Sequence, residues 1–196
     1  MTQFMGAAGG TPHQRGLFGM PEDANPDNQL HISGGTVIVD GSSESMNGAI
    51  DYGSGEFNIS GGFLVAVGSA GMAQAPSASS SQCSLLVNFD QPQTASTLVH
   101  VEDEQGNPIV TIVPTKPFQS LVVSSPAFKV GAKYSVYLGG SCSGVVNDGV
   151  CTGDYTPGTR FAQVTLTAIT TFIGQVAQMG PGGPRGGTNP FIPGRR

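Results

Sequence analysis

Carboxylate side chains dominate the first half of the chain, and they have no basic side chains near them in the sequence. Between Arg15 and Lys116 there is no Lys or Arg, whereas the same stretch contains eleven acidic residues. Ca²⁺ takes about six to eight oxygen ligands and needs no basic neighbour, so this pattern suits a calcium site. A solvated acidic surface fits it equally well. The acids are Glu22, Asp23, Asp27, Asp40, Glu44, Asp51, Glu56, Asp90, Glu102, Asp103 and Glu104.

Two of the three cysteines are placed to close a short loop. Cys142 and Cys151 flank SGVVNDGV, a segment rich in turn residues, so we expect a disulfide and hence an oxidising compartment. Two free thiols are the alternative, and Cys83 is left over in either case. No Cys/His spacing typical of a zinc site occurs.

Composition excludes several classes of protein. Charged residues make up 11% of the 196 residues, against about 25% in an average soluble domain, which argues against a coiled coil and a basic nucleic-acid binder. No apolar run reaches the ~18 residues of a membrane span. The first ten residues lack the basic and apolar regions of a signal peptide.

A repeat of 27 residues occupies the region after the N-terminal arm. His31–Gly41 recurs as Asn58–Gly68, with Ser-Gly-Gly and a closing Gly in register. Strand, Gly-Gly corner and strand at this period are typical of one coil of a parallel β-helix, although a repeated hairpin is the alternative. Alternation predicts two apolar faces, of which the outer one must be covered by the C-terminal half or the arm. The inward set is Val37, Val39, Leu64 and Ala66, and the outward set is Ile38, Val65 and Val67.

The remaining chain predicts an antiparallel sheet or small sandwich. Residues 69–83 are small and polar and predict a linker or extended crossing segment. Strand patterns follow at 85–89, 98–101, 109–113, 119–123, 133–138 and 160–173. We therefore divide the chain into an arm (1–27), coils (28–75), a β-rich region (76–174) and a Gly/Pro-rich tail (175–196).

Four segments carry a resemblance to a known family: LHISGGTVIVDG, NGAIDYGSGEFNISGGFLVAVGSAGMAQAPS, SLLVNF and STLVHVEDEQGNPIVTIVPTKPFQSLVVSSPAFKVGAKYSVYLGG. Through them residues 28–140 resemble the C-terminal part of bacterial extracellular carbohydrate-binding domain-containing proteins, which have a polysaccharide-lyase-like right-handed parallel β-helix. The implied fold is all-β: a short, about two-coil, right-handed parallel β-helix remnant followed by an antiparallel, sandwich-like half. The family has several more coils on the N-terminal side, so we expect this chain to be a fragment, a processed form or a short paralogue.

The resemblance implies a secreted or cell-surface protein that binds polysaccharide, either cellulose or acidic sugars, with calcium held between coils. It makes Asp51 the best calcium candidate. A shift of one 27-residue coil brings Asp51 near Asp23 or Asp27, where a cation would relieve the repulsion between carboxylates. Capping of its own turn is the alternative role for Asp51. Further oxygen donors in the intervening loop are Asp40, Glu44 and Asn47.

Aromatic and basic residues bear on the ligand. Tyr52 beside Asp51 is the candidate sugar-stacking ring, with packing at the edge of the core as its alternative role. Tyr134 and Tyr137 are three residues apart and fall on opposite faces of a strand. β-Elimination needs a base, and between Arg15 and Lys116 only His31 and His100 could serve. We therefore expect no enzyme activity, and a lyase is the least favoured alternative.

A different class of function is assembly. A two-coil stack leaves an open end that invites another copy of the chain. We expect residues 1–27 either to cap that end or to insert into a neighbouring copy.

Overall fold

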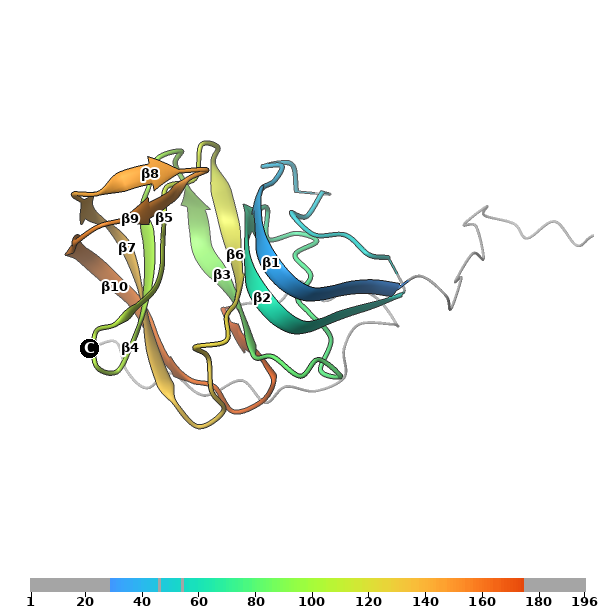
Figure 1. The fold of residues 1–196 in the computed structure, drawn as a ribbon. Coiled ribbons are helices and arrows are strands. Elements are labelled where there is room, and N and C mark those ends of the chain that lie inside the picture. The colour runs from blue at the N-terminus through green and yellow to red at the C-terminus, as the bar shows by residue number, and fades with distance from the viewer. Residues whose placement is uncertain (1–28, 46, 54, 175–196) are drawn as a thin grey trace, which may run out of the picture.

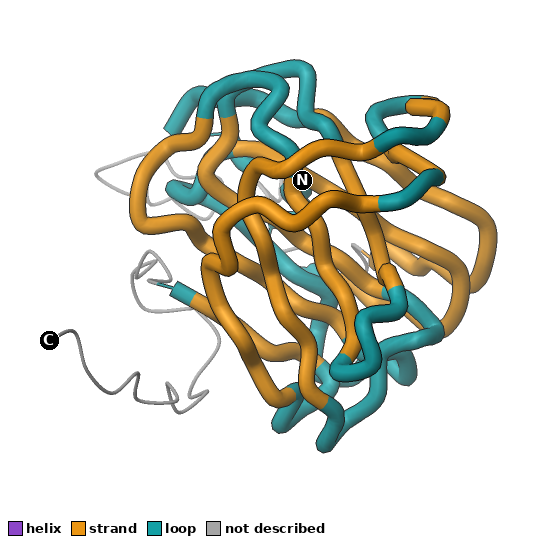
Figure 2. Tube along the Cα trace, turned by 90° about the vertical axis from the view of Figure 1, so that its left-hand side faces the viewer, coloured by secondary structure: helices purple, strands orange, loops and turns teal. Residues whose placement is uncertain are grey.

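The computed structural model describes residues 29–45, 47–53 and 55–174, and this part of the chain is all β with no helix. Two sheets face each other (Figure 1). Sheet A has the strand order β1-β2-β6-β3-β11, and sheet B has the order β10-β7-β4-β5-β9-β8. Figure 2 shows the loops gathered at the two ends of the strands. The bounds are β1 Gln29–Asp40, β2 Glu56–Gly68, β3 Ser84–Gln93, β4 Val99–Asp103, β5 Pro108–Ile112, β6 Phe118–Ser124, β7 Lys133–Cys142, β8 Val145–Asn147, β9 Val150–Thr152, β10 Tyr155–Thr165 and β11 Thr170–Ile173.

The repeat forms a parallel pair of strands, so the repeated-hairpin alternative is wrong. β1 pairs with β2 at a separation of 27 residues, from Gln29 opposite Glu56 to Asp40 opposite Val67, with a register shift at the glycine corner. Only glycine fits at the Gly-Gly corner of β2, because the backbone of β1 lies very close to it there. A Cβ on Gly61 would lie 2.5 Å from the Ser33 carbonyl oxygen, and Gly62 has a φ of +88°.

The loops that follow the two strands also stack. The Gly41 amide donates to the Val67 carbonyl (2.8 Å) and the Ser69 amide donates to the Ser42 carbonyl (2.9 Å). Each copy therefore contributes a strand and a return loop to one layer. The interior between strands and loops holds the predicted inward set, with Leu64 and Ala66 fully buried and Val37 and Val39 packed against them.

The opposite face of β2 belongs to the main core between the two sheets. Val65 and Val67 are both 0% exposed and pack with side chains of sheet B, while Ile38 packs at the margin. Of the two covers predicted for this face, the C-terminal half or the arm, the structure shows the C-terminal half. β2 also pairs antiparallel with β6, so the regions divided at residue 75 share one sheet.

Residues 69–83 run alongside the first half of β2. β1 occupies one edge of that half, and residues 69–83 bond to the other edge. The Ser77 amide donates to the Phe57 carbonyl (2.6 Å), and the Ser77 and Ser80 hydroxyls accept the amides of Phe57 (3.1 Å) and Ile59 (3.0 Å). The serine-rich composition thus has a structural cause: hydroxyl groups take the place of a strand partner.

Two details of the C-terminal half differ from the expectations. The strand predicted over 160–173 is broken, because the chain leaves sheet B after Thr165 and enters sheet A as β11 beside β3. Leu166 anchors the crossing by exchanging backbone bonds with Gly131 (2.7 Å) and Ala132 (3.0 Å). The loop between the paired cysteines contains the short hairpin β8–β9. The arm (1–27) and the whole tail (175–196) lie outside the described residues.

Ser80→Ala tests whether serine hydroxyls hold residues 69–83, which we call the serine crossing, against β2. Ser80→Ala leaves the buried Ile59 amide without its acceptor, so we expect a loss of about 1–2 kcal/mol of unfolding free energy in urea denaturation. Ser81→Ala, at an exposed neighbouring position, is the control and should change stability by less than about 0.5 kcal/mol. Equal stability of the two variants would contradict the assigned role of Ser80.

Candidate functional site

Three of the predicted calcium donors, Asp40, Asn47 and Asp51, make contacts within the protein. Asp51 accepts the Gly53 amide (3.0 Å), which closes its own turn. Asp40 accepts the backbone amide of Thr115 (2.7 Å) and also its hydroxyl, so its carboxylate ties the end of β1 to a loop before β6. The Asn47 carbonyl accepts the Ser69 hydroxyl (3.2 Å).

The described residues include only part of the predicted donor set. Asp23 and Asp27 lie outside the described residues. Within the described part of the chain, no three His, Cys, Asp or Glu side chains converge on one point.

Tyr52 lies at the edge of the coil interior. Its ring meets Phe57 edge-on, with ring centroids 5.8 Å apart, and its hydroxyl donates to the Ala75 carbonyl (3.3 Å). Burial raises the pKa of Tyr52, the Ser77 side chain lowers it and Glu56 raises it. Half-buried in this way, the ring packs between a strand and a return loop rather than lying beside Asp51 as an open platform.

The predicted disulfide is present. Cys142, at the end of β7, is bonded to Cys151 in β9, with Cα atoms 6.5 Å apart. Cys83 is a buried free thiol, and burial raises its pKa, so it is a packing residue in the main core.

A second group of polar and aromatic residues lies on the outer face of sheet B. Along β4 the valines Val99 and Val101 point into the main core, so His100 and Glu102 point outward. The same alternation in β7 buries Tyr134 and turns Tyr137 outward, which confirms that the two tyrosines occupy opposite faces. The outward group, which we call the sheet B face, consists of His100, Glu102, Thr111, Ser135, Tyr137, Tyr155, Arg160 and Gln163.

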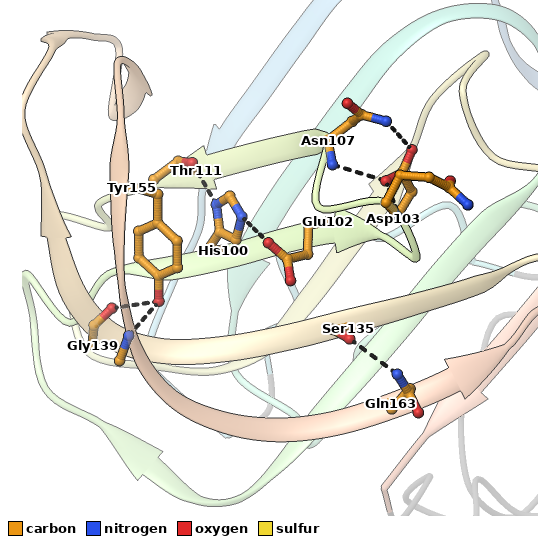
Figure 3. Close-up of polar contacts among 11 residues, drawn as sticks. His100, Glu102, Asp103, Asn107, Thr111, Ser135, Gly139, Tyr155 and Gln163 are labelled. Atoms are coloured by element: carbon orange, nitrogen blue, oxygen red, sulfur yellow. Dashed lines mark hydrogen bonds and ion pairs between the residues drawn. The ribbon is translucent and has the colours of Figure 1, made fainter.

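His100 is the centre of the sheet B face (Figure 3). It is 2% exposed; its Nδ1 lies 2.7 Å from the Thr111 hydroxyl and its Nε2 lies 3.3 Å from a Glu102 carboxylate oxygen. Burial lowers the pKa of His100, and Glu102 only partly offsets this, so the imidazole is neutral at pH 7. The proton then belongs on Nε2, which faces the carboxylate, and Nδ1 accepts from Thr111. Both ring nitrogens are engaged, and His100 has no free nitrogen to act as a base.

Tyr155 covers the imidazole. The two rings are stacked, with centroids 3.9 Å apart and planes inclined by 16°. The Tyr155 hydroxyl donates to the Gly139 carbonyl (3.0 Å) and accepts the Gly158 amide (2.9 Å). Burial raises the pKa of Tyr155, so the phenol remains a donor at neutral pH.

Tyr155 lies at the end of the two-stranded ribbon formed by β7 and β10, and the shape of this ribbon places its ring over His100. The ribbon is close-packed where it bends: a Cβ on Gly140 would lie 2.3 Å from the Thr156 carbonyl. Tyr155 lies opposite Cys142 in the ladder, and Cys142 is bonded to β9. The disulfide therefore ties the ribbon end to the far side of sheet B, and the Tyr155 ring is held in a fixed orientation.

Several polar and aromatic groups on this face remain accessible. The Glu102 side chain is 21% exposed, Tyr137 and Tyr155 are half-buried, and Arg160 and Gln163 are exposed. Arg160 lies opposite Tyr137 in the ladder and so projects from the same side of the sheet. The result is a surface with two rings, a carboxylate, a guanidinium and an amide.

A small hollow of about 100 Å³ lies elsewhere, where the loops after β1 and β2 meet the chain before β6. Its lining includes Ser43, Ser69, Pro117 and Phe118, and no ionisable side chain. Such a hollow holds a few waters and offers no reactive group.

Comparisons with known proteins leave the family open. No family model matches the chain, and neither a curated protein nor a solved structure matches it. Among the described residues, no helix is long and apolar enough to cross a membrane.

Sequence reasoning did not find the sheet B face. The His-Val-Glu alternation of β4 was the available signal, because a strand with valines inward must turn His100 and Glu102 outward. Tyr155 had no such signal, since its contact with His100 depends on the bend of a ribbon 55 residues away in sequence.

The buried His100 gives folding stability a defined pH dependence. Because its folded pKa lies below the unperturbed 6.5, the unfolded chain takes up the proton first, and stability falls as the pH drops below about 6.5. We expect the thermal midpoint to fall between pH 7.5 and pH 5.5, and His100→Gln to remove much of that change. His31→Gln, at an exposed histidine, is the control. An unaltered pH dependence in His100→Gln would refute the assignment.

Proposed function

We propose that the chain is a non-catalytic carbohydrate-binding protein of the bacterial cell surface, and that it binds polysaccharide on the sheet B face. The observation that carries the proposal is the Tyr155 ring, held in one orientation by the His100 stack, two hydroxyl hydrogen bonds and a disulfide-linked ribbon. A platform fixed before the ligand arrives reduces the entropy lost on binding.

The chemistry of the face suits a sugar. Sugar rings present C–H groups on their faces, which pack on aromatic rings, and hydroxyl groups at their edges. Glu102 accepts hydrogen bonds, Arg160 donates, and Gln163 does both. The open shape favours a polymer that runs across the surface over a small molecule that needs enclosure. Arg160 further supplies a partner for the carboxylate of an acidic sugar.

The state of His100 supports binding over catalysis. Uronate elimination needs a base beside the sugar, and the imidazole here has both nitrogens occupied and a lowered pKa. Its role in the proposal is to position Tyr155 and Glu102. The Cys142–Cys151 disulfide supports a location outside the cytosol.

Calcium dependence is a separate part of the proposal and concerns the coil region. Asp51 would act with Asp23 or Asp27 from the arm, as the resemblance implies. The sheet B face holds a single carboxylate near its centre, so binding there does not require the cation.

Retention on insoluble cellulose and on polygalacturonate, with and without chelator, tests both parts. We expect Tyr137→Ala and Glu102→Gln to weaken retention about tenfold, which corresponds to about 1.4 kcal/mol, with both variants still folded at the assay temperature. Tyr137 is suitable because its hydroxyl is not used to hold the ribbon.

Asp51→Asn and Tyr52→Phe are the matched variants in the coil region. If polysaccharide binds to the sheet B face, both variants should be retained on the polymers as well as the unaltered protein. If Asp51→Asn and chelator abolish retention while Tyr137→Ala does not, the binding site is the calcium site and the sheet B proposal is wrong. Absence of retention on both polymers would reject carbohydrate binding as a whole.

A further inference from the structure

The return loop that follows β1 contains a chemically reactive pair of residues. Asn47-Gly48 is the only Asn-Gly pair in the chain. An asparagine side chain followed by glycine is open to attack by the next backbone nitrogen, because glycine has no side chain to hinder the approach. Asn47 is exposed, and its own amide donates to the Glu44 carbonyl (3.0 Å) in a turn of the loop. The pair therefore lies where water reaches the asparagine side chain.

Packing explains why glycine occupies position 48. A Cβ on Gly48 would overlap the carbonyl oxygen of Met72, which belongs to the return loop after β2. Gly48 has no positive φ, so the contact between the two loops, and not the backbone conformation, excludes a side chain there. The stacking of the return loops thus requires the residue that makes Asn47 reactive.

The attacking nitrogen is not held in a hydrogen bond. Among the described residues, the Gly48 amide has no hydrogen-bond acceptor. The related pair Asp40-Gly41 differs: the Gly41 amide donates to the Val67 carbonyl (2.8 Å), and the Asp40 carboxylate accepts the Thr115 amide (2.7 Å). Hydrogen bonds therefore hold both reacting groups of the pair at the end of β1, whereas the pair in the loop has its nitrogen available.

We propose that Asn47 is a site of spontaneous deamidation through a cyclic imide. The Gly48 nitrogen loses its proton to solvent and attacks the side-chain carbonyl carbon of Asn47. A new C–N bond forms, the bond to the side-chain nitrogen breaks, and that nitrogen takes up a proton and leaves as ammonia. Water then opens one of the two C–N bonds of the five-membered ring, which gives either aspartate or isoaspartate at position 47. Water is the only co-reactant.

The two products change the loop in different ways. Both replace a neutral amide by a carboxylate in a segment that already contains Asp40, Glu44 and Asp51. Isoaspartate also lengthens the main chain by one carbon. The Asn47 carbonyl accepts the Ser69 hydroxyl (3.2 Å), and the next residue packs on the second return loop, so the longer main chain falls within the stacked part of the two loops.

Peptide mapping of the full chain after storage at mildly alkaline pH tests the proposal. Asn147 is the internal control, because it is equally exposed but precedes Asp148 instead of glycine. We expect the peptide with Asn47 to deamidate at least about tenfold faster, a difference of about 1.4 kcal/mol in activation free energy. The rate should rise with pH, since the attacking nitrogen must lose its proton. Equal rates at the two positions overturn the proposal.

Two further measurements separate the cyclic path from its alternatives. Isoaspartate at position 47, seen as resistance to a protease that cleaves before aspartate, is expected from the ring; aspartate alone indicates direct hydrolysis and overturns the proposal. Asn47→Gln in the full chain should give no such product. The folded chain should react within about a hundredfold, or about 2.7 kcal/mol, of the rate in concentrated urea. A slower folded rate means that the loop shields the pair, and the proposal is wrong.

Discussion

β2 is the strand on which the rest of the structure depends. It is hydrogen-bonded along its length on one side by β1, and on the other side by the serine crossing and then by β6. Its two faces are also both buried, with Leu64 and Ala66 in the core between sheet A and the loops that cover it, and Val65 and Val67 in the main core. One segment thereby joins a parallel stack to an antiparallel sandwich. A polar residue at any of these four positions would face a packed core.

Because both faces of β2 are buried, the repeat sequence was enough to predict its burial and its pairing with β1. FLVAV has no polar position, so the strand had to be covered on both faces, and the fixed 27-residue offset placed Val37 opposite Leu64. The short strands of the second half were predictable for a similar reason, since Val99–Val101 and Val110–Ile112 alternate. The break after Thr165 could not be predicted, because no residue in the local pattern indicates that the chain changes sheets there.

The two candidate sites differ in how their side chains are held. In the coil region, the Asp40 and Asp51 carboxylates accept hydrogen bonds from protein groups. On the sheet B face, the contacts leave functional groups accessible while fixing their orientation: His100 is enclosed, and the Tyr137 ring and the Glu102 carboxylate are partly exposed. Preorganised groups of this kind are typical of recognition surfaces. Composition could suggest the first site, but only the fold assembles the second.

Native-state amide hydrogen exchange on the full chain tests the central role of β2 most directly. If β2 joins the stack and the sandwich into one unit, the β2 amides bonded to β6 and the β3 amides bonded to β6 should open with the same free energy, near that of global unfolding. If the β2 amides exchange with a clearly smaller free energy while β3 and β6 stay protected, the stack is a separate, weaker unit, and β2 does not hold the two parts of the fold together.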